Sequence, residues 1–96
     1  MAGGSVLGSV DKALRALQHL GETGAEGLAL TRLAAELKLN KASLHRTLSS
    51  LKHRGFIEQD ARGNYRLGRA ILVLADSYLR DESLRRIFHD GLAEYW

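Results

Sequence analysis

Apolar residues recur at helical intervals over most of the chain. In the first stretch they lie three or four residues apart behind Ser9, a favourable helix cap, at Val10, Ala13, Leu14, Leu17 and Leu20. This spacing predicts a helix that starts at Ser9 and stops at Gly21, because glycine commonly follows the last helical residue. The start of the chain lacks the charged and apolar segments of a signal peptide, and we expect residues 1–8 to be a disordered lead.

Two shorter helical patterns follow, with a small polar turn between them. Leu28–Leu30 is an apolar piece that suits one short strand, and Thr31 is placed to cap a second helix. Asn40 is placed to cap a third helix, from about Lys41 to His53. Two short helices joined by roughly three or four residues are typical of a helix-turn-helix.

Alternating residues after the third helix predict a β-hairpin. Gly55 suits the left-handed conformation in which the chain leaves the helix. Residues 56–59 and 65–67 alternate as strands do, and the turn between them contains Gly63 and Asn64, which suit positive φ. Two strands with a tight basic turn, directly after a helix-turn-helix, are typical of a wing.

Two more helices complete the prediction. Residues 69–79 are apolar over much of their surface, and residues 83–96 carry apolar positions at helical spacing. The fold class we expect is mainly α with a small β-wing: a winged helix-turn-helix followed by a linker helix. The parts would be the disordered lead (1–8), the winged helix-turn-helix domain (9–80) and a linker or dimerisation helix (81–96).

The composition fits a single domain. The chain has 96 residues, of which 45% are hydrophobic, enough for one modest core. Proline is absent, so nothing blocks long helices, and the absence of cysteine excludes disulfides, thiolate metal sites and thiol nucleophiles. No apolar run approaches the ~20 residues of a membrane span. We expect a cytoplasmic protein with no metal, no cofactor and no membrane contact.

Positive charge is concentrated in the middle of the chain. Residues 31–69 contain nine basic and three acidic residues, so this stretch is +6 although the whole chain is only +3. A basic block in an otherwise near-neutral chain indicates a polyanionic partner, and a solvated basic surface is the alternative from charge alone.

The predicted third helix has two different faces. Leu44, Leu48 and Leu51 form one narrow stripe, which predicts that they point into the core. The opposite side has small residues and no acidic ones, so it allows close approach to a DNA major groove, where Arg46 can donate two hydrogen bonds to guanine. The base contacts that we expect are Ala42, Ser43, His45, Arg46 and Ser49.

Cations, hydroxyl groups and helix-terminal N–H groups are candidates for contact with DNA phosphates. The expected set is Lys12, Thr31, Lys41, Ser50, Lys52, Arg62 and Arg66. Arg62, at the hairpin tip, can alternatively enter a minor groove. Simpler roles remain open: Thr31 as a helix cap only, Arg62 as a solvated turn residue and Lys12 as an unspecific surface charge. His45 can instead pack along the side of its helix.

Three stretches resemble the IclR family of bacterial transcription factors. They are SVDKALRALQHL, LTRLAAELKLNKASLHRTLSSLKHRGFIE and GNYRLGRAILVLA, and the likeness covers roughly residues 5–80. The resemblance implies a dimer that binds a double-stranded DNA operator, an inverted repeat, with the third helix in the major groove. The wing, at residues 61–64, would then touch the neighbouring backbone or the minor groove. It also implies that a small-molecule effector acts only through a domain beyond the linker helix, which we expect to be absent from this chain.

Functions of other classes are alternatives to DNA binding. Winged helices also serve as docking units without specific DNA binding, and Phe88, Leu92, Tyr95 and Trp96 suit a homodimer seam or a protein partner. RNA binding is disfavoured because no aromatic stacking platform is evident. An enzyme is disfavoured too, since the histidines do not cluster with carboxylates, and His45 with Ser49 lacks an orienting acid.

Overall fold

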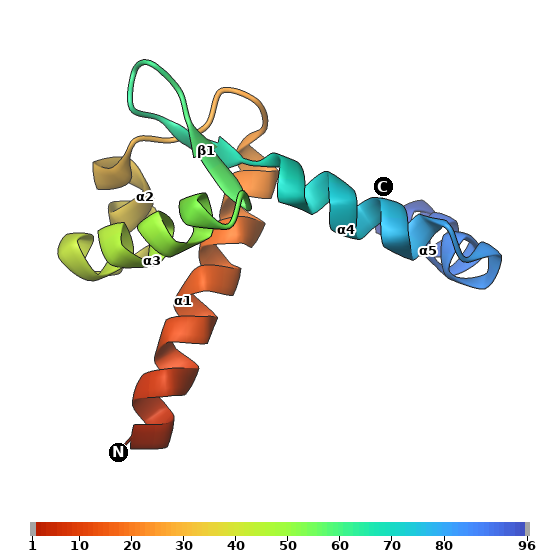
Figure 1. Cartoon of the computed structure of the whole chain (residues 1–96), viewed down its shortest axis with the longest axis horizontal. Helices are drawn as coiled ribbons and strands as arrows, with labels where there is room; N and C mark the ends of the chain where they lie inside the picture. Colours follow the sequence, from red (N-terminus) through yellow and green to blue (C-terminus); the bar gives the residue numbers. More distant parts are fainter. Residues whose placement is uncertain (1, 96) are drawn as a thin grey trace.

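The computed structural model describes the backbone of residues 2–95 and the side chains of residues 8–91. The elements are α1 (Ala2–Thr23), α2 (Leu30–Leu37), α3 (Lys41–His53), β1 (Ile57–Gln59), β2 (Tyr65–Leu67), α4 (Arg69–Leu79) and α5 (Glu82–Tyr95). In Figure 1, α2, α3 and the hairpin pack beside the long helix α1. Helix α4 extends away from these elements and leads to α5. The predicted fold class, a winged helix-turn-helix with an added helical segment, is confirmed.

The turn between α2 and α3 has the geometry of a helix-turn-helix. Lys38 adopts the left-handed conformation (φ 57°, ψ 46°), and its N–H donates to carbonyls at the end of α2. Asn40 is extended (φ −63°, ψ 129°) and its side chain accepts a hydrogen bond from the N–H of Ser43 at 3.0 Å. The predicted cap and the predicted bounds of α3 are both confirmed.

The Asn40 cap provides a first test of the fold. Replacing Asn40 with alanine removes the acceptor of the Ser43 N–H, so we expect the free energy of unfolding to fall by about 0.5–2 kcal/mol. Urea denaturation followed by circular dichroism measures this loss. Asn40→Asp, which retains an acceptor oxygen, should stay close to the parent protein. Equal stability of the alanine variant and the parent would show that the cap contributes nothing.

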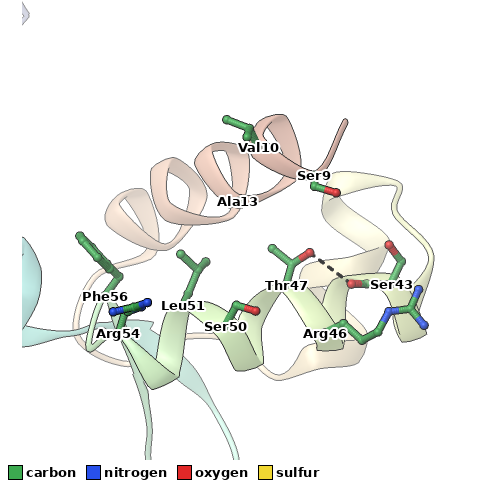
Figure 2. Close-up of a pocket in the computed structure, with 10 residues that line it drawn as sticks. All are labelled: Ser9, Val10, Ala13, Ser43, Arg46, Thr47, Ser50, Leu51, Arg54 and Phe56. Atoms are coloured by element: carbon green, nitrogen blue, oxygen red, sulfur yellow. Dashed lines mark hydrogen bonds between the residues drawn. The ribbon is translucent and has the colours of Figure 1, made fainter. Parts of the chain in front are cut away.

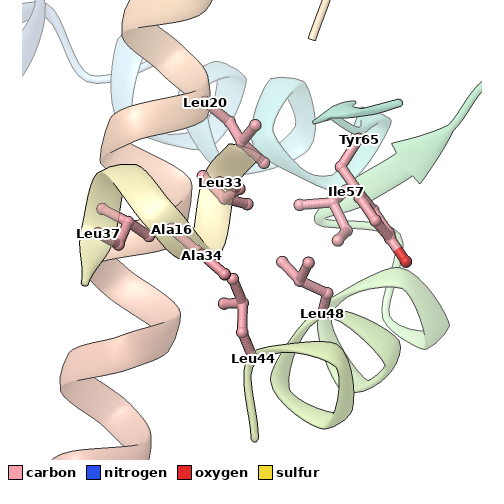
Figure 3. Packing of buried hydrophobic residues seen from close by; sticks show 9 residues of the cluster. All are labelled: Ala16, Leu20, Leu33, Ala34, Leu37, Leu44, Leu48, Ile57 and Tyr65. Carbon is pink, nitrogen blue, oxygen red and sulfur yellow. The ribbon is translucent and has the colours of Figure 1, made fainter. Parts of the chain in front are cut away.

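The core lies where α1, α2, α3 and the hairpin meet (Figure 3). Its buried members are Ala16, Leu20, Leu33, Ala34, Leu37, Leu44, Leu48, Ile57 and Tyr65. Leu44 and Leu48 have no exposed surface, and Leu51 packs against the cluster as a partly buried residue. The leucine stripe of α3 therefore faces inward as predicted, which fixes the opposite side of this helix toward solvent.

The wing is a short antiparallel hairpin. Ile57 pairs with Leu67 and Gln59 with Tyr65, while Gly63 takes the positive φ (89°) that its turn requires. Leu28 pairs with Tyr65 only as an isolated bridge, since Leu30 already belongs to α2. The hairpin is confirmed, and the strand expected over Leu28–Leu30 is reduced to this single bridge.

The first helix differs from the prediction. It begins at Ala2 and not at Ser9, so residues 2–8, for which we expected a disordered lead, are helical in backbone. It also continues past Gly21 to Thr23. Glycine within a helix costs only about 1 kcal/mol relative to alanine, and no proline interrupts this stretch, so glycine alone does not fix either end.

Two turn assignments also need correction. The second helix starts at Leu30, its N-cap position is occupied by Ala29, and no side chain bonds there, so Thr31 lies in the first turn and is not the cap. Asn64 does not share the positive φ of Gly63. Ala29 already has the extended conformation of an N-cap residue, and Gly63 already provides the positive φ of the turn.

The C-terminal helices match their predicted bounds to within a few residues. No residue of α4 is buried, and Leu72, Val73 and Leu74 are 71%, 67% and 56% exposed. Phe88 of α5 is 39% exposed, whereas Trp96 and the side chains of Leu92 and Tyr95 lie outside the described residues. In the part of the chain that the structure describes, no helix is both long and apolar enough to cross a membrane.

Candidate nucleic-acid interface

The outward side of α3 is the centre of the candidate site. Ala42, His45, Arg46 and Ser49 are all exposed, as the inward position of the leucine stripe requires. Lys41 and Ser50 are exposed on the same helix, and no acidic residue occurs within it. The structure therefore brings together, on one side of α3, four of the five residues expected to contact bases.

Ser43, the fifth, lies on the flank of α3 that faces α1. It is half-buried, and its hydroxyl oxygen accepts a hydrogen bond from the ammonium group of Lys12 at 2.8 Å. Its carbonyl accepts a hydrogen bond from the hydroxyl of Thr47 at 3.2 Å. Ser43 and Lys12, expected as a base contact and a phosphate contact, are thus bonded to each other in the protein alone.

A groove of about 500 Å³ runs between this flank of α3 and the first helix (Figure 2). Val10 and Ala13 line it from α1, and Leu51 and Phe56 extend its apolar surface. Its cations are Arg46 and Arg54, which lie towards opposite ends of α3 in Figure 2. None of the described residues that line it is acidic.

Arg54 is a candidate that sequence reasoning missed. It occupies the C-cap position of α3, it is exposed, and it lines the same groove as Arg46. The available signal was the run Lys52-His53-Arg54, three basic or titratable residues immediately before the turn at Gly55. A cation at the end of the helix adds positive charge to the flank of the proposed contact face.

The wing turn presents Arg62 to solvent on a hydrogen-bonded backbone. The Asp60 carboxylate accepts hydrogen bonds from the N–H groups of Arg62 and Asn64, each at 2.9 Å. The N–H of Gly63 donates to the carbonyl of Asp60 at 3.0 Å. These bonds fix the shape of the turn while the guanidinium group of Arg62 stays exposed.

Two more of the expected phosphate contacts are engaged within the protein. The ammonium group of Lys52 donates to the side-chain oxygen of Gln59 at 3.0 Å. The guanidinium of Arg66 pairs with the Glu58 carboxylate at 2.8 Å, because the register of the hairpin places these residues opposite each other. To contact a DNA phosphate, each cation must therefore either share its hydrogen bonds with this internal partner or release the partner.

Thr31 lies at the edge of the candidate site. It is exposed in the first turn of α2, where a helix leaves main-chain N–H groups without a partner in the helix itself. One turn further along, the Glu36 carboxylate accepts hydrogen bonds from Arg32 at 2.7 Å and from His19 at 2.6 Å. The hydrogen bond from the Arg32 guanidinium, and after it the one from His19, lowers the pKa of the Glu36 carboxyl. The ionised carboxylate therefore holds Arg32 in an ion pair within the protein.

No metal centre is formed by the described residues: they include no group of three or more His, Cys, Asp or Glu side chains that could hold a metal ion. His45 and His53 lie on the exposed side of α3 and His19 on α1.

A helix-turn-helix followed directly by a hairpin wing defines the winged helix-turn-helix class. Residues 9–61, more than half of the chain, match the profile of the IclR helix-turn-helix domain. The chain therefore belongs to the IclR family, whose members are DNA-binding transcriptional regulators and not enzymes.

Individual relatives agree with this assignment. The chain is 40% identical over 74 residues to a glycerol operon regulatory protein of Streptomyces griseus, which covers 73% of this chain and 29% of the relative. It is 28% identical over 82 residues to the transcriptional repressor IclR of Escherichia coli, covering 84% of this chain and 30% of the relative. The chain thus spans less than a third of the length of these two relatives.

Solved structures show the same fold. Pseudomonas aeruginosa HmgR superimposes with a TM-score of 0.70 at 30% identity, covering 81% of this chain and 33% of that one. The Agobacterium tumefaciens repressor BlcR gives a TM-score of 0.75 at 22% identity over 99% of this chain and 38% of that one. The second similarity extends the fold over the C-terminal helices.

Proposed function

We propose that the protein binds double-stranded DNA sequence-specifically, as the DNA-binding module of a bacterial transcriptional regulator. The observation that carries this proposal is the outward side of α3, which is exposed, free of acidic residues, lined by small side chains and held in place by the buried Leu44 and Leu48. Such a helix can enter the major groove closely enough to read base edges. A bacterial operator lies in the cytoplasm, and there we place the protein.

Arg46 is the principal base contact in this proposal. Its exposed guanidinium has the length and the paired donors to bond guanine, and Ala42 and Ser49 beside it are small enough for close approach. His45 extends the reading surface along the same helix. Ser43 contributes from the flank, where its hydroxyl is shared with Lys12.

Phosphate contacts surround this reading surface. Lys41, Ser50, Thr31 and Arg62 are exposed, and Arg54 adds a further cation at the end of α3. We keep Lys12, Lys52 and Arg66 in the phosphate set, with the added feature that each is oriented by an internal partner. The turn at 61–64 would lie on the neighbouring backbone or in the minor groove.

We further propose that the protein acts as a homodimer on an inverted repeat. Val10 and Leu14 of α1 are 52% and 54% exposed, and apolar residues of α4 are also exposed in the single chain. Apolar surface of this kind supports a subunit contact. Two-fold symmetry in a dimer would be mirrored in the DNA site. Any small-molecule effector would act through a domain outside this chain.

Selection from a random duplex pool tests the proposal directly. We expect an inverted repeat to be enriched, and binding to the selected duplex to weaken with salt by a slope of about −0.9 in log K against log salt for each neutralised phosphate. Fluorescence anisotropy at several salt concentrations measures the slope. A pool without enrichment would remove sequence-specific DNA binding from consideration.

A protein-interaction module is the second candidate function. The observation that favours it is the exposure of three apolar residues of α4, Leu72, Val73 and Leu74. A docking role would predict that the protein associates with itself or a partner while duplex selection yields no sequence. The two functions are therefore separated by the same experiment.

A further inference from the structure

Two hydrogen bonds connect the end of α3 to the wing turn through one side chain. Lys52 Nζ donates to Gln59 Oε1 at 3.0 Å, and Gln59 Nε2 donates to the carbonyl of Gly63 at 3.1 Å. Lys52 lies in the last turn of α3, Gln59 is the last residue of β1, and Gly63 follows Arg62 in the turn. The amide of Gln59 thus stands between the helix and the wing turn and is bonded to both.

The chemistry of the two partners fixes the orientation of this amide. An ammonium group can only donate and a carbonyl can only accept, so the amide oxygen must face Lys52 and the amide nitrogen must face Gly63. A carboxylate at residue 59 would keep only the first bond, and an aliphatic side chain would keep neither. Gln59 is exposed, so packing in the core does not explain why its side chain lies between these two partners.

The wing turn does not need Gln59 for its own shape. The Asp60 carboxylate already holds the N–H groups of Arg62 and Asn64, and the Gly63 N–H bonds the Asp60 carbonyl. These local bonds do not connect the turn to α3. The Gln59 side chain does, because it is bonded to both.

We propose that Gln59 is a positioning residue, which holds the wing turn and its Arg62 at a fixed offset from α3. The wing and the outward side of α3 then meet DNA as one rigid unit, and less conformational freedom is lost when Arg62 makes its contact. This inference rests on the proposed DNA-binding function, and it assigns Gln59 no contact with DNA. Its consequence is that the contribution of Arg62 to binding depends on Gln59.

A double-mutant cycle tests this dependence. Gln59→Met keeps the length and charge of the side chain and removes both hydrogen bonds. We expect Arg62→Ala to weaken binding of the selected duplex about fivefold in the parent and less than about twofold in the Gln59→Met background. Anisotropy titrations of the four proteins at one salt concentration give the Kd values.

Gln18→Met on α1 is the matched control, since Gln18 is also exposed and lines a hollow with residues of α1 and α2 and none of the hairpin. It should leave the Kd and the Arg62 effect unchanged, and thermal unfolding should show that Gln59→Met is folded as the parent is. An equal Arg62 effect in both backgrounds, or no Arg62 effect in the parent, overturns the positioning role and leaves α3 as the reading helix. If the parent binds no duplex, the proposed function fails and the positioning role fails with it.

Discussion

Replacing Arg46 with alanine is expected to weaken binding to the selected duplex by about 1–3 kcal/mol, which is roughly a 5- to 150-fold rise in Kd. Arg46 is exposed at the centre of the outward side of α3, so its replacement takes away the proposed base contacts and leaves the core untouched. Titrations against duplexes with each base pair replaced in turn measure the loss. We expect discrimination to relax at one guanine position and to persist elsewhere.

The control for this change is Arg85→Ala, which removes an equal charge from an exposed position on α5. It should alter the Kd by less than about twofold, because surface charges far from the DNA are screened. The double reversal Arg46→Glu with Arg62→Glu should abolish DNA binding while the oligomeric state is kept. Unaltered binding by Arg46→Ala would mean that α3 is not the helix placed in the groove.

The sequence was sufficient to predict α3 because several local signals agree there. Asn40 supplies a cap, the three leucines supply the inward stripe, and Gly55 supplies the left-handed exit (φ 80°). Each signal depends on residues close together in the chain. The outward side of the helix follows from the inward side by geometry alone, so its exposed residues were predictable as well.

Side-chain partners from other elements were beyond the sequence. The charges of Lys12 and Lys52 were visible, but their acceptors, Ser43 and Gln59, are set by how α1 and the hairpin pack against α3. Both lysines were therefore expected simply as phosphate contacts, whereas in the structure each also connects α3 to a neighbouring element. Arg66 differs, since a known hairpin register is enough to place it opposite Glu58.

The start of α1 shows a limit of a different kind. The pattern from Val10 onward predicts the helix correctly, but no comparable apolar pattern occurs over residues 1–8, which were expected to be disordered. Glycine lowers helix stability without forbidding the helical backbone, so a glycine-rich start leaves the first residue of a helix undetermined. The end at Thr23, past Gly21, has the same explanation.

Leu48→Ala should cause the largest loss of stability among these changes. The side chain has no exposed surface and lies among Leu33, Leu44 and Ile57 in the core (Figure 3). Removing a buried leucine side chain to alanine costs about 2–5 kcal/mol through lost burial and the cavity left behind. The free energy of unfolding of a small domain is only about 5–15 kcal/mol, so a large share of the stability would be lost.

Thermal and urea unfolding measure this loss, and the matched control is Leu72→Ala, because Leu72 is 71% exposed on α4. The same chemical change there should stay within about 0.5 kcal/mol of the parent. Leu48 lies behind the reading surface and touches no base in the proposed complex. Leu48→Ala should therefore weaken DNA binding only by raising the fraction of unfolded protein. Saturating duplex should therefore restore part of the Tm of Leu48→Ala, whereas no addition of duplex should restore the affinity lost in Arg46→Ala. If Leu48→Ala were as stable as Leu72→Ala, the inward orientation of α3, and with it the outward placement of Arg46, would be wrong.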